Sequence, residues 1–309
     1  MSDSVFKGVI TPLLTPIDTE EKIDEKSLRK LVKYQLSNGV HGLWASGTSS
    51  EFPALREEER VKTIQLVVDE VNGKVPVIGN VTMPSTRLTV ELAKQIIGNG
   101  VSAIAATPPY FFSHTQTEIA DHYRAIRHSV DVPLWIYNIP VMHKTPVSPS
   151  TVATLASEGV ISGIKDSSGT GELLTELHIL RDNMGFDLCS TLGTSVRVGV
   201  ALSLGAQGVV PALANVIPGI FVDIWNSSES SNFEKIKLLN EKVMTALQLG
   251  LLRKPPESTQ GSIFSGYKKA LVELGIIEFD FVTKPHKALT PDEAKSIPSI
   301  LNKLDARAV

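Results

Sequence analysis

The sequence predicts a (β/α)8 TIM barrel with a C-terminal helical extension. The first observation is a regular alternation of short apolar segments with longer segments of helical periodicity. The second is their number, because eight strands begin between residues 5 and 215 and each is followed by a helix. Strands that alternate with helices form parallel sheets, and eight units match a closed barrel. An open, doubly wound sheet is the alternative, but no G-x-G-x-x-G turn opens a helix.

Each predicted strand is a short run of apolar and β-branched residues bounded by turn residues. The predicted strands span residues 5–14, 42–47, 75–81, 103–107, 133–138, 161–166, 187–191 and 208–213.

The predicted helices have apolar residues three or four positions apart, and Asn-Gly pairs end the first three. They span residues 24–37, 56–72, 86–99, 116–129, 149–157, 172–183 and 196–204, followed by 216–226, 233–249, 262–274 and 291–304. One of the last four completes the barrel. We therefore expect residues 1–215 to form the barrel and residues 216–309 its last helix and the extension, within the same structural unit.

Composition narrows the class of protein. The 309 residues are 42% hydrophobic with a net charge of -3, which leaves no basic footprint for nucleic acid or an anionic membrane. No apolar run reaches the length of a membrane-spanning helix, and the first residues lack the pattern of a secretory signal. The single cysteine, Cys189, suits a reducing compartment. We expect a cytoplasmic protein that binds neither nucleic acid nor membranes.

In a barrel of this kind, functional residues lie at the carboxyl ends of the strands. The second strand runs into Gly47–Glu51, whose small hydroxyl residues and backbone N–H groups suit a carboxylate. An ordinary polar loop is the alternative for this segment. The fourth strand runs into the aromatic segment 108–112, for which packing or a subunit contact is the alternative. The fifth ends with Tyr137, which otherwise is an amphipathic core residue.

Lys165 lies in the middle of the apolar sixth strand. A lysine is rarely buried unless it is paired, and desolvation favours the neutral amine that imine chemistry needs. A surface lysine at a strand end is the alternative. Tyr137 lies one βα unit earlier, so we expect it on the adjacent strand, where a phenol can move protons while the amine attacks. The pair predicts an imine-forming site.

A metal-dependent mechanism has no support in the sequence. The seven histidines show no spacing typical of metal ligands. We expect no metal.

Five motifs, each on the expected strand and in the expected order, give the chain a family resemblance. It resembles the dihydrodipicolinate synthase / N-acetylneuraminate lyase family of class I, Schiff-base pyruvate aldolases, from about residue 5 to 215 and loosely beyond. The motifs are Gly47-Thr48-Ser49-Ser50-Glu51, Thr107-Pro108-Pro109-Tyr110, Tyr137-Asn138-Ile139-Pro140, Gly163-Ile164-Lys165-Asp166-Ser167-Ser168-Gly169 and the segment 205–215. The resemblance implies a barrel with a C-terminal helical segment, usually assembled as a homotetramer of tight dimers.

The resemblance also implies roles for single residues. Lys165 would form the Schiff base with pyruvate or a related 2-oxo acid, so that no cofactor beyond this covalent imine is needed. Tyr137 would act as general acid and base. Thr48 and Ser49 would bind the substrate carboxylate, and Thr48 would join Tyr137 and Tyr110 in a proton relay, with Tyr110 reaching in from the neighbouring subunit.

Two further residues complete the implied site. Val210 would offer its backbone carbonyl near the amine. Ser167, two residues after Lys165 and on the same face, would point at substrate hydroxyl groups.

Departures from the family pattern bear on the substrate. Members that make dihydrodipicolinate usually carry an arginine at the position of Met142, and a thioether cannot replace a guanidinium. We do not expect His143 or Lys144 to compensate. Ser50 replaces a glycine of the first motif, and residues 193–195 read Gly-Thr-Ser where the family often has Gly-Asp-Asp.

The segments Glu51-Phe52-Pro53 and 165–169 look like the branch of the family that acts on 2-keto-3-deoxy sugar acids or 4-hydroxy-2-oxoglutarate. The resemblance therefore implies a class I aldolase or lyase that acts on pyruvate and a 2-keto-3-deoxy sugar acid or a related 2-oxo acid, with an aldehyde as the second reactant. Dihydrodipicolinate (4-hydroxy-tetrahydrodipicolinate) synthase is one alternative. A non-catalytic barrel that binds a 2-oxo acid is the other, since a fold alone does not establish a function.

Overall fold

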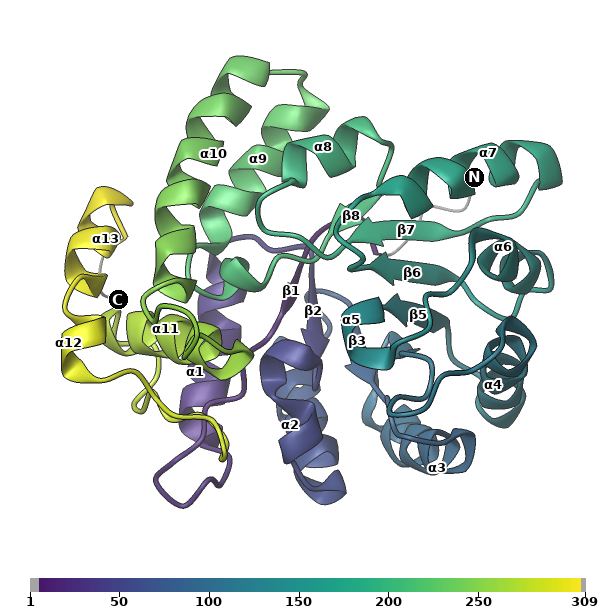
Figure 1. Cartoon of the computed structure of the whole chain (residues 1–309), viewed down its shortest axis with the longest axis horizontal. Helices are drawn as coiled ribbons and strands as arrows, with labels where there is room; N and C mark the ends of the chain where they lie inside the picture. Colours follow the sequence, from purple (N-terminus) through teal and green to yellow (C-terminus); the bar gives the residue numbers. More distant parts are fainter. Residues whose placement is uncertain (1–5, 307–309) are drawn as a thin grey trace. The chain divides into compact units, whose positions relative to one another are not determined.

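The computed structural model describes residues 6–306, and its strands close into an eight-stranded barrel in the order β1 to β8 (Figure 1). Parallel pairing runs from β3 through β8 and on to β1. The strands are Gly8–Pro12, Gly42–Ala45, Val77–Asn80, Ala103–Ala106, Leu134–Asn138, Gly163–Asp166, Cys189–Leu192 and Gly208–Val209. The predicted barrel is confirmed, although Val5, the predicted start of the first strand, lies outside the described residues.

Helices follow the strands as the periodicity predicts, with side-chain caps at several N-termini. Asp24 caps the first helix by accepting a 3.0 Å hydrogen bond from the Ser27 N–H. Up to the eighth strand the α-helices are α1 Glu25–Ser37, α2 Glu57–Val71, α3 Thr86–Ile96, α4 Gln116–Ser129, α5 Pro140–His143, α6 Pro149–Ser157, α7 Glu172–Met184 and α8 Val198–Ser203. After it come α9 Pro218–Glu229, α10 Phe233–Leu247, α11 Gln260–Glu273, α12 Pro291–Ala294 and α13 Ile297–Lys303. Short 3-10 helices are η1 Thr48–Ser50, η2 Phe52–Ala54, η3 Ile97–Asn99, η4 Ala212–Asn215 and η5 Gln248–Gly250.

Two predicted elements differ clearly from the structure, and one helix was not predicted. The strand predicted over 208–213 ends at Val209, and its last residues belong to η4. The helix predicted over 291–304 is broken into α12 and α13, because Pro298 lacks an N–H and is accommodated only in the first turn of a new helix. The short helix α5 was not predicted, since four residues carry no measurable periodicity.

The barrel interior is filled by large aromatic rings set against small residues. Trp44 packs edge-on against Trp135 and Tyr137, with ring centroids 6.2 and 5.4 Å apart. Gly163, paired with Trp135 across β5 and β6, has to be a glycine because a Cβ there would overlap the indole ring. Ala103 on β4 belongs to the same buried cluster. The core of the barrel is thus closed by packing, as is usual for this architecture.

The chain divides into two compact units, each built from separate segments. Within the described residues, the first unit takes the chain up to Ile10, His41–Trp44 and Pro76–Val210. The second takes Thr11–Val40, Ala45–Val75 and the chain from Pro211 onward. The predicted division into residues 1–215 and 216–309 of one structural unit stays a prediction.

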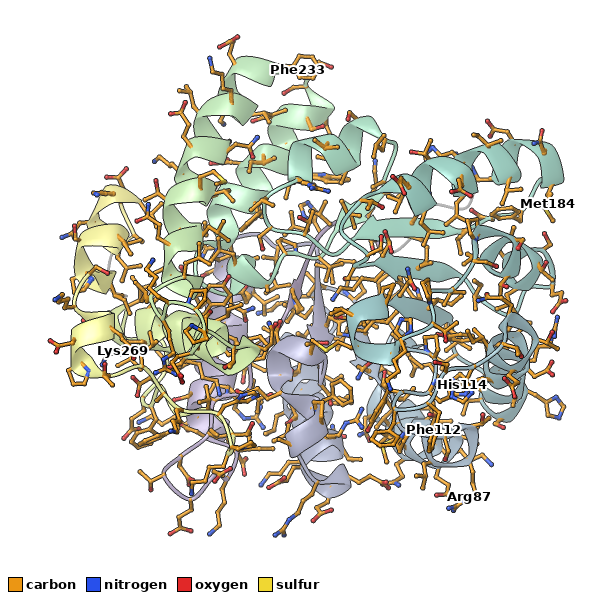
Figure 2. The ribbon with its side chains drawn as sticks, viewed as in Figure 1. Arg87, Phe112, His114, Met184, Phe233 and Lys269 are labelled. Atoms are coloured by element: carbon orange, nitrogen blue, oxygen red, sulfur yellow. The ribbon has the colours of Figure 1, made fainter. Side chains whose placement is uncertain are left out.

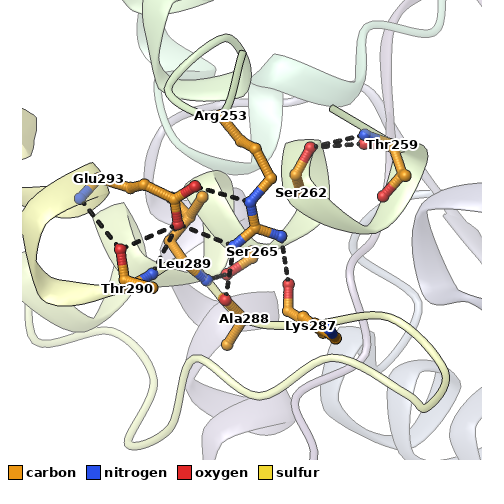
Figure 3. A network of polar contacts seen from close by, with 9 residues as sticks. All are labelled: Arg253, Thr259, Ser262, Ser265, Lys287, Ala288, Leu289, Thr290 and Glu293. Carbon is orange, nitrogen blue, oxygen red and sulfur yellow. Dashed lines mark hydrogen bonds and ion pairs between the residues drawn. The ribbon is translucent and has the colours of Figure 1, made fainter. Parts of the chain in front are cut away.

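A polar network ties together the C-terminal segments of the second unit (Figure 3). The Arg253 guanidinium donates two hydrogen bonds to the Glu293 carboxylate, of 2.7 and 2.8 Å. It also donates to the carbonyl oxygens of Lys287 and Ala288. The segment between α11 and α12 is therefore anchored by a bidentate ion pair and two carbonyl contacts.

None of the helices in the described part of the chain combines the length and the apolar character needed to cross a membrane.

Candidate active site

Lys165 is a buried lysine whose nearest charge-stabilising neighbours are aromatic faces. Its side chain lies on β6 and is 5% exposed, so the surface alternative is wrong. The Nζ atom lies 4.1 Å from the ring centroid of Tyr137 and 4.9 Å from that of Trp44. Within residues 6–306, no carboxylate lies within ion-pair distance of this amine. A cation over a ring gains about 1 kcal/mol or somewhat more, and these two rings are the contacts that the structure gives the amine.

Space around the lysine depends on a glycine after β7. A Cβ on Gly193 would overlap the Ser167 hydroxyl and lie 2.9 Å from the Cε atom of Lys165. The Gly193 N–H donates a 2.7 Å hydrogen bond to the Asp166 carbonyl, which continues the pairing of β6 and β7 beyond the strands. The loop that begins at Gly193 therefore passes directly beside the lysine, and any larger residue would displace the side chains of Ser167 and Lys165.

Tyr137 lies directly opposite Lys165 in the register of β5 and β6, so the predicted adjacency is confirmed. The tyrosine is 2% exposed. Because side chains alternate between the two faces of a strand, Trp135 points to the same face one layer deeper. The phenol and the amine thus share the interior face, in the layer nearer the carboxyl ends of the strands.

A pair of buried polar residues locks β5 to β6 beside this layer. The Asn138 side-chain amide donates a 2.8 Å hydrogen bond to Asp166, which is fully buried. Asp166 also accepts hydrogen bonds from the backbone N–H and the hydroxyl of Ser168, of 3.2 and 2.7 Å. Sequence reasoning did not assign these two residues a role, although both stand inside the motifs that it singled out.

Ser167 follows directly after β6 and is half-buried. Its N–H donates a 2.7 Å hydrogen bond to the Asn138 carbonyl, so the β5–β6 ladder extends by one residue. Its hydroxyl lies in the space that a Gly193 side chain would fill. The hydroxyl therefore points to the same side as the Lys165 side chain.

The turn that carries Thr48 and Ser49 is the 3-10 helix η1, directly after β2. Ser49 is buried and Thr48 is half-buried. Ser50 is buried too, and its hydroxyl donates a 2.7 Å hydrogen bond to the Leu13 carbonyl. Glu51 ends the turn with a φ of 58°, in the left-handed region that non-glycine residues rarely occupy.

Tyr110 lies in the loop after β4 and is half-buried. Threonines hold the base of this loop: the Thr107 N–H donates a 2.9 Å hydrogen bond to the Thr82 hydroxyl. The two phenylalanines that follow Tyr110 are exposed, Phe111 at 70% and Phe112 at 69%, and Figure 2 shows the Phe112 side chain at the surface. A pair of large exposed apolar side chains is unusual for a surface that meets only water.

The loop after β5 contains α5 and the departure at Met142, whose side chain is 45% exposed. Next to it, His143 is buried and its Nε2 atom accepts a 2.8 Å hydrogen bond from the Ile139 N–H. Burial lowers the pKa of His143 to about 4, so the ring is neutral at pH 7 and holds the turn. The Lys144 ammonium lies 5.7 Å from the centroid of the Phe111 ring.

Val210 lies one residue past the short strand β8 and is 2% exposed. Its N–H donates a 2.9 Å hydrogen bond to the Leu192 carbonyl. The residue belongs to the same buried cluster as Trp44 and Tyr137.

No group of three or more histidine, cysteine, aspartate or glutamate side chains that could hold a metal ion is found among residues 6–306.

Known proteins resemble the chain over nearly its whole length. Residues 5–304 match the family model of the dihydrodipicolinate synthetase family. A 4-hydroxy-tetrahydrodipicolinate synthase of Oceanobacillus iheyensis is 28% identical over 300 residues, which cover 97% of this chain and 98% of the relative.

Solved structures also resemble the chain over nearly its whole length. Dihydrodipicolinate synthase from Bacteroides thetaiotaomicron superposes with a TM-score of 0.90 at 28% identity, over 98% of this chain and 100% of that one. CdNal from Clostridium difficile, solved in complex with mannosamine, superposes with a TM-score of 0.86 at 25% identity, over 97% and 99% of the two chains. Both the sequence motifs and these likenesses lead to one conclusion: the chain belongs to the dihydrodipicolinate synthetase family and is an enzyme of its pyruvate-dependent lyase class.

Proposed function

We propose that the protein is a Schiff-base aldolase or lyase that acts on pyruvate and a 2-keto-3-deoxy sugar acid or a related 2-oxo acid. The Lys165 amine attacks the keto carbon to form a carbinolamine. Tyr137 then gives a proton to the carbinolamine hydroxyl, which leaves as water, so that an iminium ion and the Tyr137 phenolate remain. In cleavage, the C3–C4 bond breaks, its electron pair moves into the iminium as an enamine, and the C4 hydroxyl gives up its proton to form the aldehyde. Synthesis is the reverse, with the enamine as nucleophile.

The observation that carries this chemistry is the pairing of Lys165 with Tyr137 on adjacent strands, in a buried layer where the amine lies against aromatic rings. Tyr137 acts as the general acid and base, since its phenol shares the face of the amine. The proton relay continues to Thr48 and to Tyr110.

The remaining predicted residues bind the substrate. Thr48 and Ser49, in the turn after β2, hold the carboxylate of the 2-oxo acid. Val210 contributes its carbonyl oxygen close to the amine, and Ser167 donates a hydrogen bond to a substrate hydroxyl. Lys165 itself is the covalent carrier, so the reaction needs no external cofactor.

The choice of a sugar acid rests on Met142. A second substrate with a carboxylate of its own requires a cation in the loop after β5, where a guanidinium fork would give a bidentate contact. Met142 offers a neutral thioether at that place, half-exposed and beside the neutral ring of His143. A polyhydroxylated partner fits a loop without this cation, and the hydroxyl groups of Ser167 and of residues 194 and 195 suit it.

Borohydride trapping tests the imine. Incubation of the protein with pyruvate and borohydride should add the mass of a reduced pyruvate adduct on Lys165. Lys165→Ala should show none. A wild-type protein without an adduct, or an adduct that persists in Lys165→Ala, would contradict the mechanism.

Dihydrodipicolinate synthase is the second candidate, because the relative from Oceanobacillus iheyensis carries the name 4-hydroxy-tetrahydrodipicolinate synthase. A coupled assay with pyruvate and aspartate semialdehyde decides between the two. Turnover of keto-deoxy sugar acids with kcat/KM at least about tenfold above that for the semialdehyde supports our proposal, and the opposite ranking supports the synthase.

For the assembly, we propose a homotetramer of tight dimers in which Tyr110 completes the site of the neighbouring subunit. The exposed Phe111 and Phe112 beside it support a subunit contact. Sedimentation velocity tests this oligomeric state. Phe112→Lys should weaken the dimer. A wild-type protein that is monomeric and fully active would contradict the proposed assembly. We further propose a cytoplasmic location, which fractionation of the native host tests.

A further inference from the structure

The turn with Thr48 and Ser49 rests on a buried ion pair that comes from the C-terminal part of the same compact unit. Lys268 lies on α11, and its side chain is fully buried. Its Nζ atom donates a 2.6 Å hydrogen bond to Glu51 Oε1 and a 2.8 Å hydrogen bond to the Phe281 carbonyl. A lysine without solvent contact needs such partners, because an unpaired buried ammonium is strongly unfavourable.

The second oxygen of Glu51 is also used. Glu51 Oε2 accepts hydrogen bonds from the backbone N–H and the hydroxyl of Thr283, both 2.8 Å long. Glu51 is 5% exposed and Thr283 is 3% exposed. The carboxylate is therefore held from both sides, by a cation and by two neutral donors, as a buried charge requires.

Glu51 belongs to the turn itself. Its N–H donates a 3.0 Å hydrogen bond to the Thr48 carbonyl, which closes η1, and its carbonyl accepts a 3.0 Å hydrogen bond from the N–H of Ala54, the last residue of η2. Its left-handed backbone costs about 1 kcal/mol or more and persists only where surrounding contacts hold it. The contacts to Lys268 and Thr283 stabilise this backbone conformation, because they fix the side chain of Glu51, the residue between η1 and η2.

The residues that hold Glu51 are anchored in turn. Phe281 and Thr283 belong to the segment after α11, and Arg253 binds the same segment at Lys287 and Ala288 while it pairs with Glu293 on α12 (Figure 3). The segment that supports the turn, residues 281–288, is therefore held near both of its ends.

We propose that Lys268 and Thr283 are positioning residues for substrate binding: through Glu51 they hold the Thr48–Ser49 turn in the shape that receives the carboxylate of the 2-oxo acid. This inference rests on the proposed function of that turn. A hydrogen bond to an anion weakens steeply as its geometry departs from alignment, so a small shift of the turn lowers affinity for the 2-oxo acid. The amine of Lys165 and its aromatic neighbours are unaffected by the change.

The sharpest test compares Thr283→Val with Thr283→Ser. Valine has the shape of threonine without its hydroxyl, whereas serine keeps the donor to Glu51. Lys268→Met removes the cation. Its matched control is Lys269→Met, because Lys269 (labelled in Figure 2) is the next residue of α11 and is partly exposed. Lys269 forms ion pairs with Glu273 and Asp280. The readout is the pyruvate concentration that gives half-maximal borohydride trapping on Lys165, together with the extent of trapping at saturation.

We expect the half-maximal pyruvate concentration to rise about tenfold in Thr283→Val and more in Lys268→Met, with the saturated extent of trapping close to that of the wild type. Thr283→Ser and Lys269→Met should match the wild type within about twofold. Should Lys268→Met fail to fold, the valine and serine pair still decides, because it leaves the ion pair in place.

Two results would overturn the inference. An unchanged pyruvate dependence in a folded Thr283→Val protein would show that the network supports stability alone. Equal losses in Thr283→Val and Thr283→Ser would show that the hydroxyl contact to Glu51 is not the cause. Failure of the proposed function is distinct from both, because the wild-type protein would then form no adduct at any pyruvate concentration.

Discussion

Among residues 6–306, two lysines are buried, and their surroundings are opposite. Lys268 is enclosed by the Glu51 carboxylate and the Phe281 carbonyl, whereas Lys165 lies against the faces of Tyr137 and Trp44. Burial lowers the pKa of Lys268, and the negative charge of Glu51 acts in the opposite direction. The ammonium of Lys268 is thus tied to fixed acceptors.

From this difference we expect a structural role for Lys268 and the proposed reactive role for Lys165. Removal of Lys268 leaves the buried Glu51 carboxylate without its cation, so we expect the cost to fall on stability and, through the turn, on substrate affinity. Removal of Lys165 strands no carboxylate found in the described residues, so the cost falls on the chemistry. Burial alone therefore does not identify a catalytic lysine, and the nature of its neighbours does.

The largest effect is expected from Lys165→Met. Methionine fills a similar space against Trp44 and Tyr137 but provides no nucleophile. We expect kcat/KM to fall by at least about 10³-fold, while the melting temperature stays within a few degrees of the wild type. Steady-state assays and calorimetry measure the two quantities. Residual activity above one part in a hundred would remove Lys165 from the reaction.

Lys268→Met should lower the stability of the protein, which Lys165→Met does not, in addition to the loss of pyruvate affinity expected above. An uncompensated Glu51 carboxylate in the interior costs about 3–5 kcal/mol of unfolding free energy. The double variant Lys268→Met, Glu51→Leu should recover part of this loss, because no charge is left buried. Urea unfolding measures the free energy of unfolding of the single and the double variant. A single variant as stable as Lys269→Met would mean that the pair is solvated in solution and that the contrast between the lysines is weaker than the structure indicates.

Two buried histidines in the first unit extend the comparison to groups without a counter-charge. Burial lowers the pKa of His122 to about 4, with the charge of His114 acting in the same direction, and burial lowers the pKa of His143 to about 4. An unfolded histidine titrates near pH 6.5, so between about pH 6.5 and 4 the unfolded chain binds protons that the folded chain does not. Stability is therefore complete above pH 6.5 and is lost as the pH falls toward 4.

Each of these histidines should lower the free energy of unfolding by on the order of 3 kcal/mol as the pH falls from 6.5 to 4. Urea unfolding at several pH values measures it. His122→Gln and His143→Gln should each reduce the dependence of the unfolding free energy on pH between pH 6.5 and 4. Lys269→Met should leave this dependence unchanged. An identical slope in the wild type and both glutamine variants would contradict the assignment of neutral, buried rings.

The smallest effect is expected from the partly exposed ion pair. The Arg253 side chain is 12% exposed and that of Glu293 is 25% exposed, and Arg253→Met also removes the contacts to two carbonyl groups. We expect a loss of about 1–2 kcal/mol, less than for Lys268→Met, because water replaces part of what is removed. Thermal unfolding in low and high salt checks this, and a loss equal to that of Lys268→Met would remove burial as the reason for the difference.

Much of the fold was accessible from local patterns. Strand and helix periodicities differ, so the alternation marked each unit, and one βα unit between Tyr137 and Lys165 implied neighbouring parallel strands. The ends of elements were less accessible. The short length of β8 depends on tertiary contacts. The helix break at Pro298 depends on how a proline fits into the first turn of a helix. The spacing of apolar residues reports neither.

The candidate site divides in the same way. Lys165, Tyr137 and the hydroxyl turn stood out because their residue types were unusual for their positions. Trp44 and Gly193 did not, since an aromatic residue and a glycine near strand ends are ordinary in sequence and gain their meaning only from the side chains that they touch. Glu51 and Lys268 are 217 positions apart, and no local signal connects them.

That separation has a consequence for synthesis of the chain. The ribosome makes the hydroxyl turn early and supplies its cation 217 residues later, on α11. Until then Glu51 has no ammonium partner, and a bare carboxylate favours water over the interior. The turn reaches its final shape only when the C-terminal helices have been made and folded, so we expect a nascent chain to contain Lys165 well before the turn that we propose for carboxylate binding is complete.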